Sequence, residues 1–160
     1  MKKLLTALML LITTFLYSQG SLIYTIEEIN HELKEFGIPV AVKDTANPNI
    51  WISEGYDELG EYGILWFWLD NDLGFVTKTL STLNSIEDFK SQKNNIKKNK
   101  DWKQKVKSKS YNQWCMEFEY YMIYVNTYEE CLQIEYVLEI KNDDYLEQQL
   151  IEQYLLEDEN

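Results

Sequence analysis

The feature that most constrains the fold is a long alternation of apolar and polar side chains between residues 102 and 140. The odd positions of this region carry many charged residues, among them Lys103, Glu117 and Glu135. Most of the apolar residues fall at even positions: Trp102, Val106, Trp114, Met116, Phe118, Tyr120, Leu132, Ile134, Tyr136, Leu138 and Ile140. A period of two is typical of β-strands with one buried and one solvated face. The alternation therefore predicts that strands cover most of this region.

We expect a first hairpin turn near Ser110. This turn would place Lys103 and Lys105 opposite Glu119 and Glu117, respectively. Cross-strand pairs of opposite charge stabilise a hairpin slightly and help to fix its register. We therefore interpret the lysines of this segment as partners of the adjacent acidic strand, rather than as a binding patch.

A second turn, near residues 126–129, would place Cys115 opposite Glu139 and Cys131 opposite Ile123. The two cysteines would then stand about eight residues apart along the strands, or roughly 26 Å. A disulfide cannot bridge that distance. Export to an oxidising compartment would favour a disulfide, but this register predicts two free thiols.

The rest of the chain shows signals for helices and for short strands. Thr25 and Glu28 have the spacing of a capping box, which marks a helix start. The expected helices cover residues 25–36, residues 85–98 and about residues 143–157. Short β-type runs occupy residues 38–42, 50–53, 62–69 and 75–80. The predicted fold class is α+β: an antiparallel sheet of two meander segments with an N-terminal helix, a mid-chain helix and a C-terminal helix.

The first 20 residues have the pattern of a secretory signal peptide. Lys2 and Lys3 precede an apolar run over residues 4–17, and small residues follow it at Ser18 and Gly20. The run is short for a transmembrane helix, and we prefer this interpretation to a buried N-terminal helix. We expect a signal peptide over residues 1–20 and a single exported domain over residues 21–160, periplasmic or extracellular. No other apolar stretch is long enough to predict that the mature chain spans a membrane.

Charge is unevenly distributed along this acidic chain. The net charge is −12 at pH 7, and lysine is the only basic residue apart from one histidine. Residues 90–109 contain nine lysines and one aspartate, whereas the segments on either side are strongly acidic. Arginine, which recognises phosphate and guanine through its two-pronged guanidinium group, does not occur. These features argue against nucleic acid as a partner.

A candidate ligand-binding site is a group of aromatic residues near an acidic, glycine-bounded loop. Its members are Trp51, Tyr56, Asp57, Tyr62, Trp66 and Trp68. Aromatic rings beside carboxylates are typical of sugar-binding sites and glycosidase clefts. An acidic loop over an ordinary aromatic core would show the same pattern. Trp66 and Trp68 either lie in a strand covered on both faces or form an exposed platform.

Two other motifs receive structural interpretations. We interpret His31, the only histidine, as a solvated residue near Glu35 on the polar side of the first helix. Residues 70–74 resemble the start of a calcium loop, but Gly74 is at the wrong position, so we expect a hairpin turn. We predict no metal site and no cofactor.

The leading functional hypothesis is an exported, non-enzymatic protein that binds or modulates another macromolecule. The polarised charge distribution favours a binding role. One alternative is a carbohydrate-binding module that uses exposed Trp and Tyr rings, and another is a small inhibitor or immunity-type protein. Whether the chain is an enzyme is uncertain, and catalysis would depend on carboxylates such as Asp57, Glu58, Asp70 and Asp72.

Overall fold

A computed structural model gives the structure of residues 22–56, 62–119 and 121–141. The predicted signal peptide over residues 1–20 and the predicted helix over about residues 143–157 lie outside the described residues, as does Asp57. Within the described residues, neither helix is long and apolar enough to cross a membrane.

The described chain forms two helices and one antiparallel sheet of eight strands. The helices are α2 (Ile26–Glu35) and α3 (Ile86–Lys98). The strands are β1 (Val42–Lys43), β2 (Ile50–Tyr56), β3 (Tyr62–Leu69), β4 (Val76–Thr82), β5 (Lys103–Lys107), β6 (Tyr111–Glu117), β7 (Tyr121–Tyr128) and β8 (Gln133–Ile140). This architecture confirms the predicted α+β class with an antiparallel sheet.

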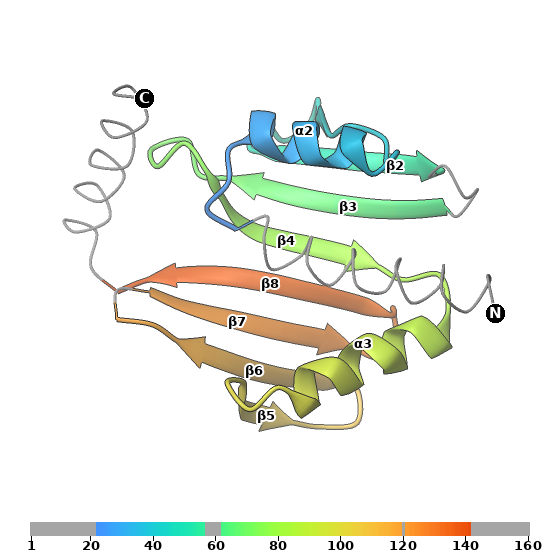
Figure 1. Ribbon diagram of the computed structural model, residues 1–160, viewed down its shortest axis with the longest axis vertical. Coiled ribbons are helices and arrows are strands. Elements are labelled where there is room, and N and C mark those ends of the chain that lie inside the picture. The colour runs from blue at the N-terminus through green and yellow to red at the C-terminus, as the bar shows by residue number, and fades with distance from the viewer. Residues whose placement is uncertain (1–21, 57–61, 120, 142–160) are drawn as a thin grey trace.

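The strand order is β1-β2-β3-β4-β8-β7-β6-β5 (Figure 1). In each half of the described chain, one helix precedes four strands that meander in sequence order. The two meanders join where β4 pairs with β8, so β1 and β5 become the outer edges. The two predicted meander segments therefore belong to a single sheet.

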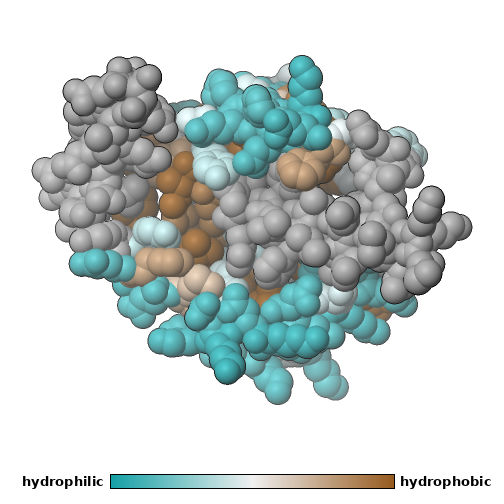
Figure 2. All heavy atoms as spheres, viewed as in Figure 1, coloured by the Kyte–Doolittle hydropathy of each residue, from teal (hydrophilic) through white to brown (hydrophobic). Residues whose placement is uncertain are grey.

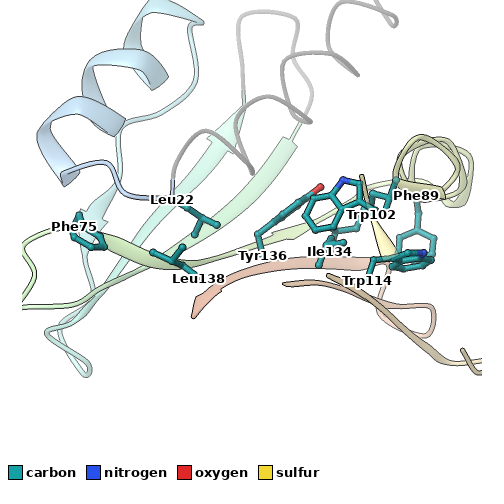
Figure 3. Packing of buried hydrophobic residues seen from close by; sticks show 10 residues of the cluster. Leu22, Phe75, Phe89, Trp102, Trp114, Ile134, Tyr136 and Leu138 are labelled. Carbon is teal, nitrogen blue, oxygen red and sulfur yellow. The ribbon is translucent and has the colours of Figure 1, made fainter. Parts of the chain in front are cut away.

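Both described helices lie on the same face of this sheet (Figure 1). Ile29 and Leu33 of α2 pack in a cluster with Phe67 of β3. On α3, Phe89 and Ile96 belong to a second cluster, which includes Trp102, Trp114, Ile134 and Tyr136 (Figure 3). We call this side of the sheet the helix face and the opposite side the open face. The burial of large apolar side chains on the helix face provides the main stabilisation of the fold.

The two described helices begin where the sequence predicts. Thr25 accepts a hydrogen bond from the Glu28 N–H, and the Glu28 carboxylate accepts one from the Thr25 N–H, which completes the capping box. Ser85 caps α3 in the same way, by accepting from the Asp88 N–H at 3.0 Å. Both caps satisfy backbone donors that have no partner within the helix.

The strand expected over residues 38–42 is wrong, because only Val42–Lys43 pairs with a neighbour. The backbone of the rest of this segment is held by hydrogen bonds to side chains of other segments. The Asn30 side chain donates to the Ala41 carbonyl at 3.2 Å and accepts from the Ala41 N–H at 2.7 Å. Ser53 donates to the carbonyl of Pro39, a residue that has no N–H for a strand ladder. The segment therefore links α2 to β2 without forming a strand of its own.

The predicted register of the first lysine-rich hairpin is also wrong. The turn is tighter than expected, because the Tyr111 carbonyl accepts a hydrogen bond from the Ser108 N–H at 2.9 Å. Lys103 therefore lies opposite Cys115, and Lys107 opposite Asn112, with an irregularity in the ladder between Gln104 and Val106. Lys103 and Lys105 do not lie opposite Glu119 and Glu117, so the predicted cross-strand pairs do not form, although both lysines help to lower the pKa of the Glu117 carboxyl.

A third turn, which the sequence analysis missed, separates β6 from β7. The Phe118 N–H donates to the Tyr121 carbonyl at 2.9 Å, and their rings stack at 4.5 Å. Cys115 therefore lies opposite Tyr124 rather than Glu139, and Ile123 lies opposite Leu138 rather than Cys131. Both thiols are free, with Cys115 buried and Cys131 exposed.

Loss of the capping box should weaken α2 and its packing on β3. We expect Thr25→Ala to lower the free energy of unfolding by about 1 kcal/mol, a typical cost of removing a threonine cap. Urea denaturation measures this change. Thr45→Ala, in the exposed loop before β2, serves as the matched control and should have little effect. An equal loss in both variants would contradict the structural role of the cap.

Candidate functional site

An apolar stripe runs along the open face of the sheet. Opposed residues of an antiparallel pair project from the same face. Trp68 is paired with Ile50 and Lys78, and Trp66 with Ile52 and Leu80, so these residues share the open face. We define the aromatic stripe as the open-face side chains of β3, which are Tyr62, Ile64, Trp66 and Trp68. Ile64, Trp66 and Trp68 are half-buried.

Four of the residues that we predicted as ligand-binding come together on this face. They are Tyr56, Tyr62, Trp66 and Trp68, from β2 and β3. At the end of the hairpin the rings of Tyr56 and Tyr62 meet edge to face, with their centroids 5.3 Å apart. Tyr62 also donates a hydrogen bond to the Glu54 carboxylate. Tyr56 is 68% exposed, so this pair is accessible at the hairpin end.

Trp51 does not share the surface that we predicted for it. It lies opposite Phe67 on the helix face and packs against the cluster under α2. The sequence analysis grouped it with Trp66 and Trp68 as an aromatic residue near the acidic, glycine-bounded loop. Side chains in a strand alternate between faces, and the register sends Trp51 to the other side.

A polar network lies beside the aromatic stripe, centred on Glu135 of β8. The Glu135 side chain is only 11% exposed, and its carboxylate has three partners. Oε1 is 2.6 Å from Lys78 Nζ, while Oε2 accepts from Asn126 Nδ2 and from the Tyr128 hydroxyl, each at 2.9 Å. A buried carboxylate needs such partners, because removing its charge from water is costly.

Asn126 extends this network to β6. Its Oδ1 accepts from the Tyr111 hydroxyl at 2.9 Å and from Gln113 Nε2 at 3.0 Å, while its Nδ2 donates to Glu135. Every polar atom of the Asn126 side chain thus has a suitable partner. The Glu135 network comprises Lys78, Tyr111, Gln113, Asn126, Tyr128 and Glu135. These residues come from four strands, β4, β8, β7 and β6.

The surroundings fix the protonation states of the network. Burial acts to raise the pKa of the Glu135 carboxyl, but the hydrogen bonds from Lys78, Asn126 and Tyr128 outweigh it and bring the pKa below its usual value. Burial and the hydrogen bond to Glu135 raise the pKa of Tyr128 far above its usual range. Burial also raises the pKa of Tyr111. At neutral pH the carboxylate is therefore ionised, and both phenols remain protonated donors.

Lys78 connects the network to the aromatic stripe. Its ammonium lies 4.5 Å from the centre of the Trp68 ring while it also binds Glu135. A cation over an indole ring is attracted by the negative face of the ring. The stripe and the network thus form one continuous surface over five strands, β3, β4, β8, β7 and β6, in which the polar groups are already paired and held in place.

The protonation state of Glu135 does not suit general-acid catalysis. A catalytic acid needs a raised carboxyl pKa, whereas the pKa of Glu135 is lowered. The pKa of Glu32 is raised, by partial burial and by repulsion from Glu28 and Glu35, but Glu32 lies on α2, away from the open face. Asp70 and Asp72 also lie elsewhere, in the turn between β3 and β4.

The two motifs that we interpreted structurally behave as expected. The Asp70 carboxylate accepts from the N–H groups of Asp72 and Leu73, and Gly74 has a φ of 76°, so residues 70–74 form the predicted turn. His31 is exposed on α2, with Nδ1 3.8 Å from the Glu35 carboxylate.

Within residues 22–56, 62–119 and 121–141, no group of His, Cys, Asp or Glu side chains could hold a metal ion.

We expect Glu135→Gln to lower the free energy of unfolding by about 1–3 kcal/mol at pH 7, because it removes the charge that Lys78, Asn126 and Tyr128 stabilise. The pKa of Glu135 is lowered in the folded protein. The carboxylate therefore contributes its full share to the free energy of unfolding at pH values above the pKa of the unfolded carboxyl. The contribution is lost as the pH falls through the lower, folded pKa. The difference between wild type and variant should therefore shrink at pH values below about 4.

Urea denaturation at neutral and acidic pH measures this difference. Glu130→Gln, in the exposed turn before β8, removes the same charge outside the network and is the control. A difference between wild type and Glu135→Gln that stays constant with pH would contradict the role assigned to the carboxylate.

Comparisons with known proteins add no match to this picture. No family model matches the chain, and neither a curated protein nor a solved structure does so. The arguments for function therefore come from the geometry of the open face.

Proposed function

We propose that this protein is an exported binding protein whose open face recognises another protein. The observation that carries this proposal is the position of the aromatic stripe, on the face without a described helix and next to the Glu135 network. The proposal of export rests on the pattern of residues 1–20. The net charge of −12 argues against nucleic acid as the partner.

The composition of the open face suits a protein interface. Tyr and Trp are enriched at the centres of such interfaces, where large rings bury much area with few rotatable bonds. Trp66 and Ile64 supply apolar area that is only half-buried. Partner contacts over the stripe would remove this remaining area from water, at about 25 cal/mol per Å². The neighbouring Glu135 network supplies ordered polar groups, which favour one partner geometry over others.

The preorganised network supports binding without rearrangement of these side chains, rather than binding by induced fit. Lys78, Asn126 and Tyr128 are held by Glu135 before any partner arrives. Their ordering cost is therefore met by folding and not by association. This arrangement leaves the side chains of the stripe as the main contributors to affinity.

A carbohydrate ligand is a second candidate, favoured by the end of the β2–β3 hairpin. There the exposed Tyr56 ring, the Tyr62 ring and the Glu54 carboxylate lie close together. Sugars stack on aromatic rings and donate hydrogen bonds to carboxylates. The Trp68 ring suits this role less well, because the Lys78 ammonium lies over it.

The protein-binding proposal predicts that open-face variants lose a specific partner. Trp66→Ala should weaken binding by about 2 kcal/mol or more, which is roughly thirtyfold in Kd. Ile64→Lys places an unpaired charge in the same stripe and should abolish binding. The experiment compares the proteins retained from the envelope and secreted fractions of the source cells by wild type and by each variant, and then measures the Kd of the retained protein.

Ile86→Lys is the matched control, since Ile86 is an exposed isoleucine on α3, away from the open face. Thermal unfolding verifies that each variant folds. Tyr62→Ala, at a more exposed position of the stripe, provides a second variant should Ile64→Lys unfold. A partner retained equally by wild type, Trp66→Ala and Tyr62→Ala would overturn the proposed role of the open face.

The carbohydrate candidate makes a different prediction. If the hairpin end binds a sugar, Tyr56→Ala should reduce retention on a glycan array by about tenfold, the effect of losing one stacking ring, or roughly 1.4 kcal/mol. Lys43→Ala, at an exposed position on β1, is the control. Absence of retention by wild type over the whole array would exclude this candidate and leave the protein-binding proposal intact.

A further inference from the structure

A dense group of lysines lies at the β5 edge of the sheet. Eight exposed lysines belong to α3, to the link that follows it, and to β5 with its turn. We call this group the basic edge; its members are Lys90, Lys97, Lys98, Lys100, Lys103, Lys105, Lys107 and Lys109. In the described part of the chain, none of them makes an ion pair. Figure 2 shows the hydrophilic surface that covers the α3 and β5 side of the molecule.

The lysines of α3 face the same side as those of the β5–β6 turn. Lys90 and Lys97 are three and four residues from Lys93, so all three lie on one flank of the helix. Lys93 forms an ion pair with Glu129, whose N–H donates to the Ser110 carbonyl at 2.9 Å. This contact places the flank of α3 beside the turn that carries Lys109. The flank of α3 and the β5–β6 turn therefore form one patch at the β5 edge, and Lys103, which lies opposite Cys115, extends it to the open-face side of β5.

Two acidic residues near the patch pair with lysines outside the basic edge. Glu129 pairs with Lys93, and Glu117, at the end of β6, pairs with Lys141 at 2.8 Å. Lys141 is the main partner of Glu117, and Lys103 and Lys105 also act on it from a greater distance, helping to lower the pKa of its carboxyl. The patch therefore keeps a net positive charge, because Asp101 is the only acidic residue among the nine lysines of residues 90–109, although the whole chain is acidic.

Protection of the sheet edge explains only part of this pattern. Lysines on an edge strand prevent unwanted pairing with another sheet, which accounts for Lys103, Lys105 and Lys107. It does not account for Lys90, Lys97 and Lys98, because these lie on a helix. A ligand for the whole patch accounts for both groups.

The chemistry of the patch favours a fluid anionic surface. Lysine is a compact point charge that does not require the fixed geometry of an arginine–phosphate pair. Stacking of nucleic acid bases would need exposed aromatic rings, but Trp102, the ring next to this lysine run, is only 6% exposed. Val106 is 40% exposed on β5, between Lys105 and Lys107, and can enter the headgroup region.

We propose that the basic edge adsorbs the protein to anionic phospholipid headgroups. Each lysine near such a surface contributes favourably, and the attraction falls off within a Debye length of about 8–10 Å at physiological salt. The acidic residues of α2 lie over the other half of the sheet. With strand spacings of about 4.8 Å, the β1 edge is roughly 34 Å from β5. Salt therefore screens the repulsion between the acidic residues of α2 and the lipid.

Sedimentation with lipid vesicles tests this proposal, using the protein as purified from cells with its N-terminus determined. The probes are phosphatidylcholine vesicles with and without phosphatidylglycerol. Wild type should bind only the anionic vesicles, and added salt should release it. Absence of binding to anionic vesicles at low salt, or equal binding to neutral ones, would overturn the proposal.

Two double variants with the same net charge separate local from overall charge. Lys97→Gln/Lys105→Gln, in the basic edge, should reduce partitioning by about tenfold or more. Lys34→Gln/Lys43→Gln, on α2 and β1, should leave it nearly unchanged. Equal loss in both variants would show that the patch is not the site. Tighter binding to single-stranded DNA or to an acidic polypeptide than to the anionic vesicles would overturn the assignment to lipid.

Discussion

The pairing of β4 with β8 is the interaction on which the arrangement of the whole sheet depends. Every other ladder joins strands that are neighbours in sequence within one half of the chain, but this ladder joins the two halves. It aligns Leu80 with Glu135, which are far apart in sequence, so its loop-closure cost must be met by the contacts that form across it. Without it, the aromatic stripe and the Glu135 network would belong to separate sheets.

The Glu135 network makes the register of this joint specific. Glu135 lies opposite Leu80, and its partner Lys78 is the diagonal neighbour on β4. A shift by one residue would turn the carboxylate to the helix face, among the side chains that pack with Ile134 and Tyr136. Burying it there without Lys78 and Tyr128 would cost several kcal/mol. The same contacts that order the open face therefore also select one alignment of the two halves.

The sequence predicts the elements better than their pairing. Capping residues and helical periodicity locate α2 and α3, because these signals are local to Thr25, Glu28 and Ser85. The turn between β6 and β7 escapes the same approach because β7 carries apolar or aromatic side chains on both faces, from Tyr121 to Val125. The candidate site is predictable only in part. Aromatic clustering identifies Trp66 and Trp68, whereas the Glu135 network depends on a register that no local pattern encodes.

The two proposed surfaces are compatible in space because one is a face of the sheet and the other an edge. Adsorption through the basic edge would bring β5 and the flank of α3 to the lipid, and the sheet would stand upright on the surface. Four strands, β4, β8, β7 and β6, separate the aromatic stripe on β3 from β5, so the stripe would remain clear of the headgroups. The acidic helix α2 would point away, so repulsion by the lipid would favour this orientation over its reverse. Charge polarity along the sheet can thus present the open face to a partner in solution.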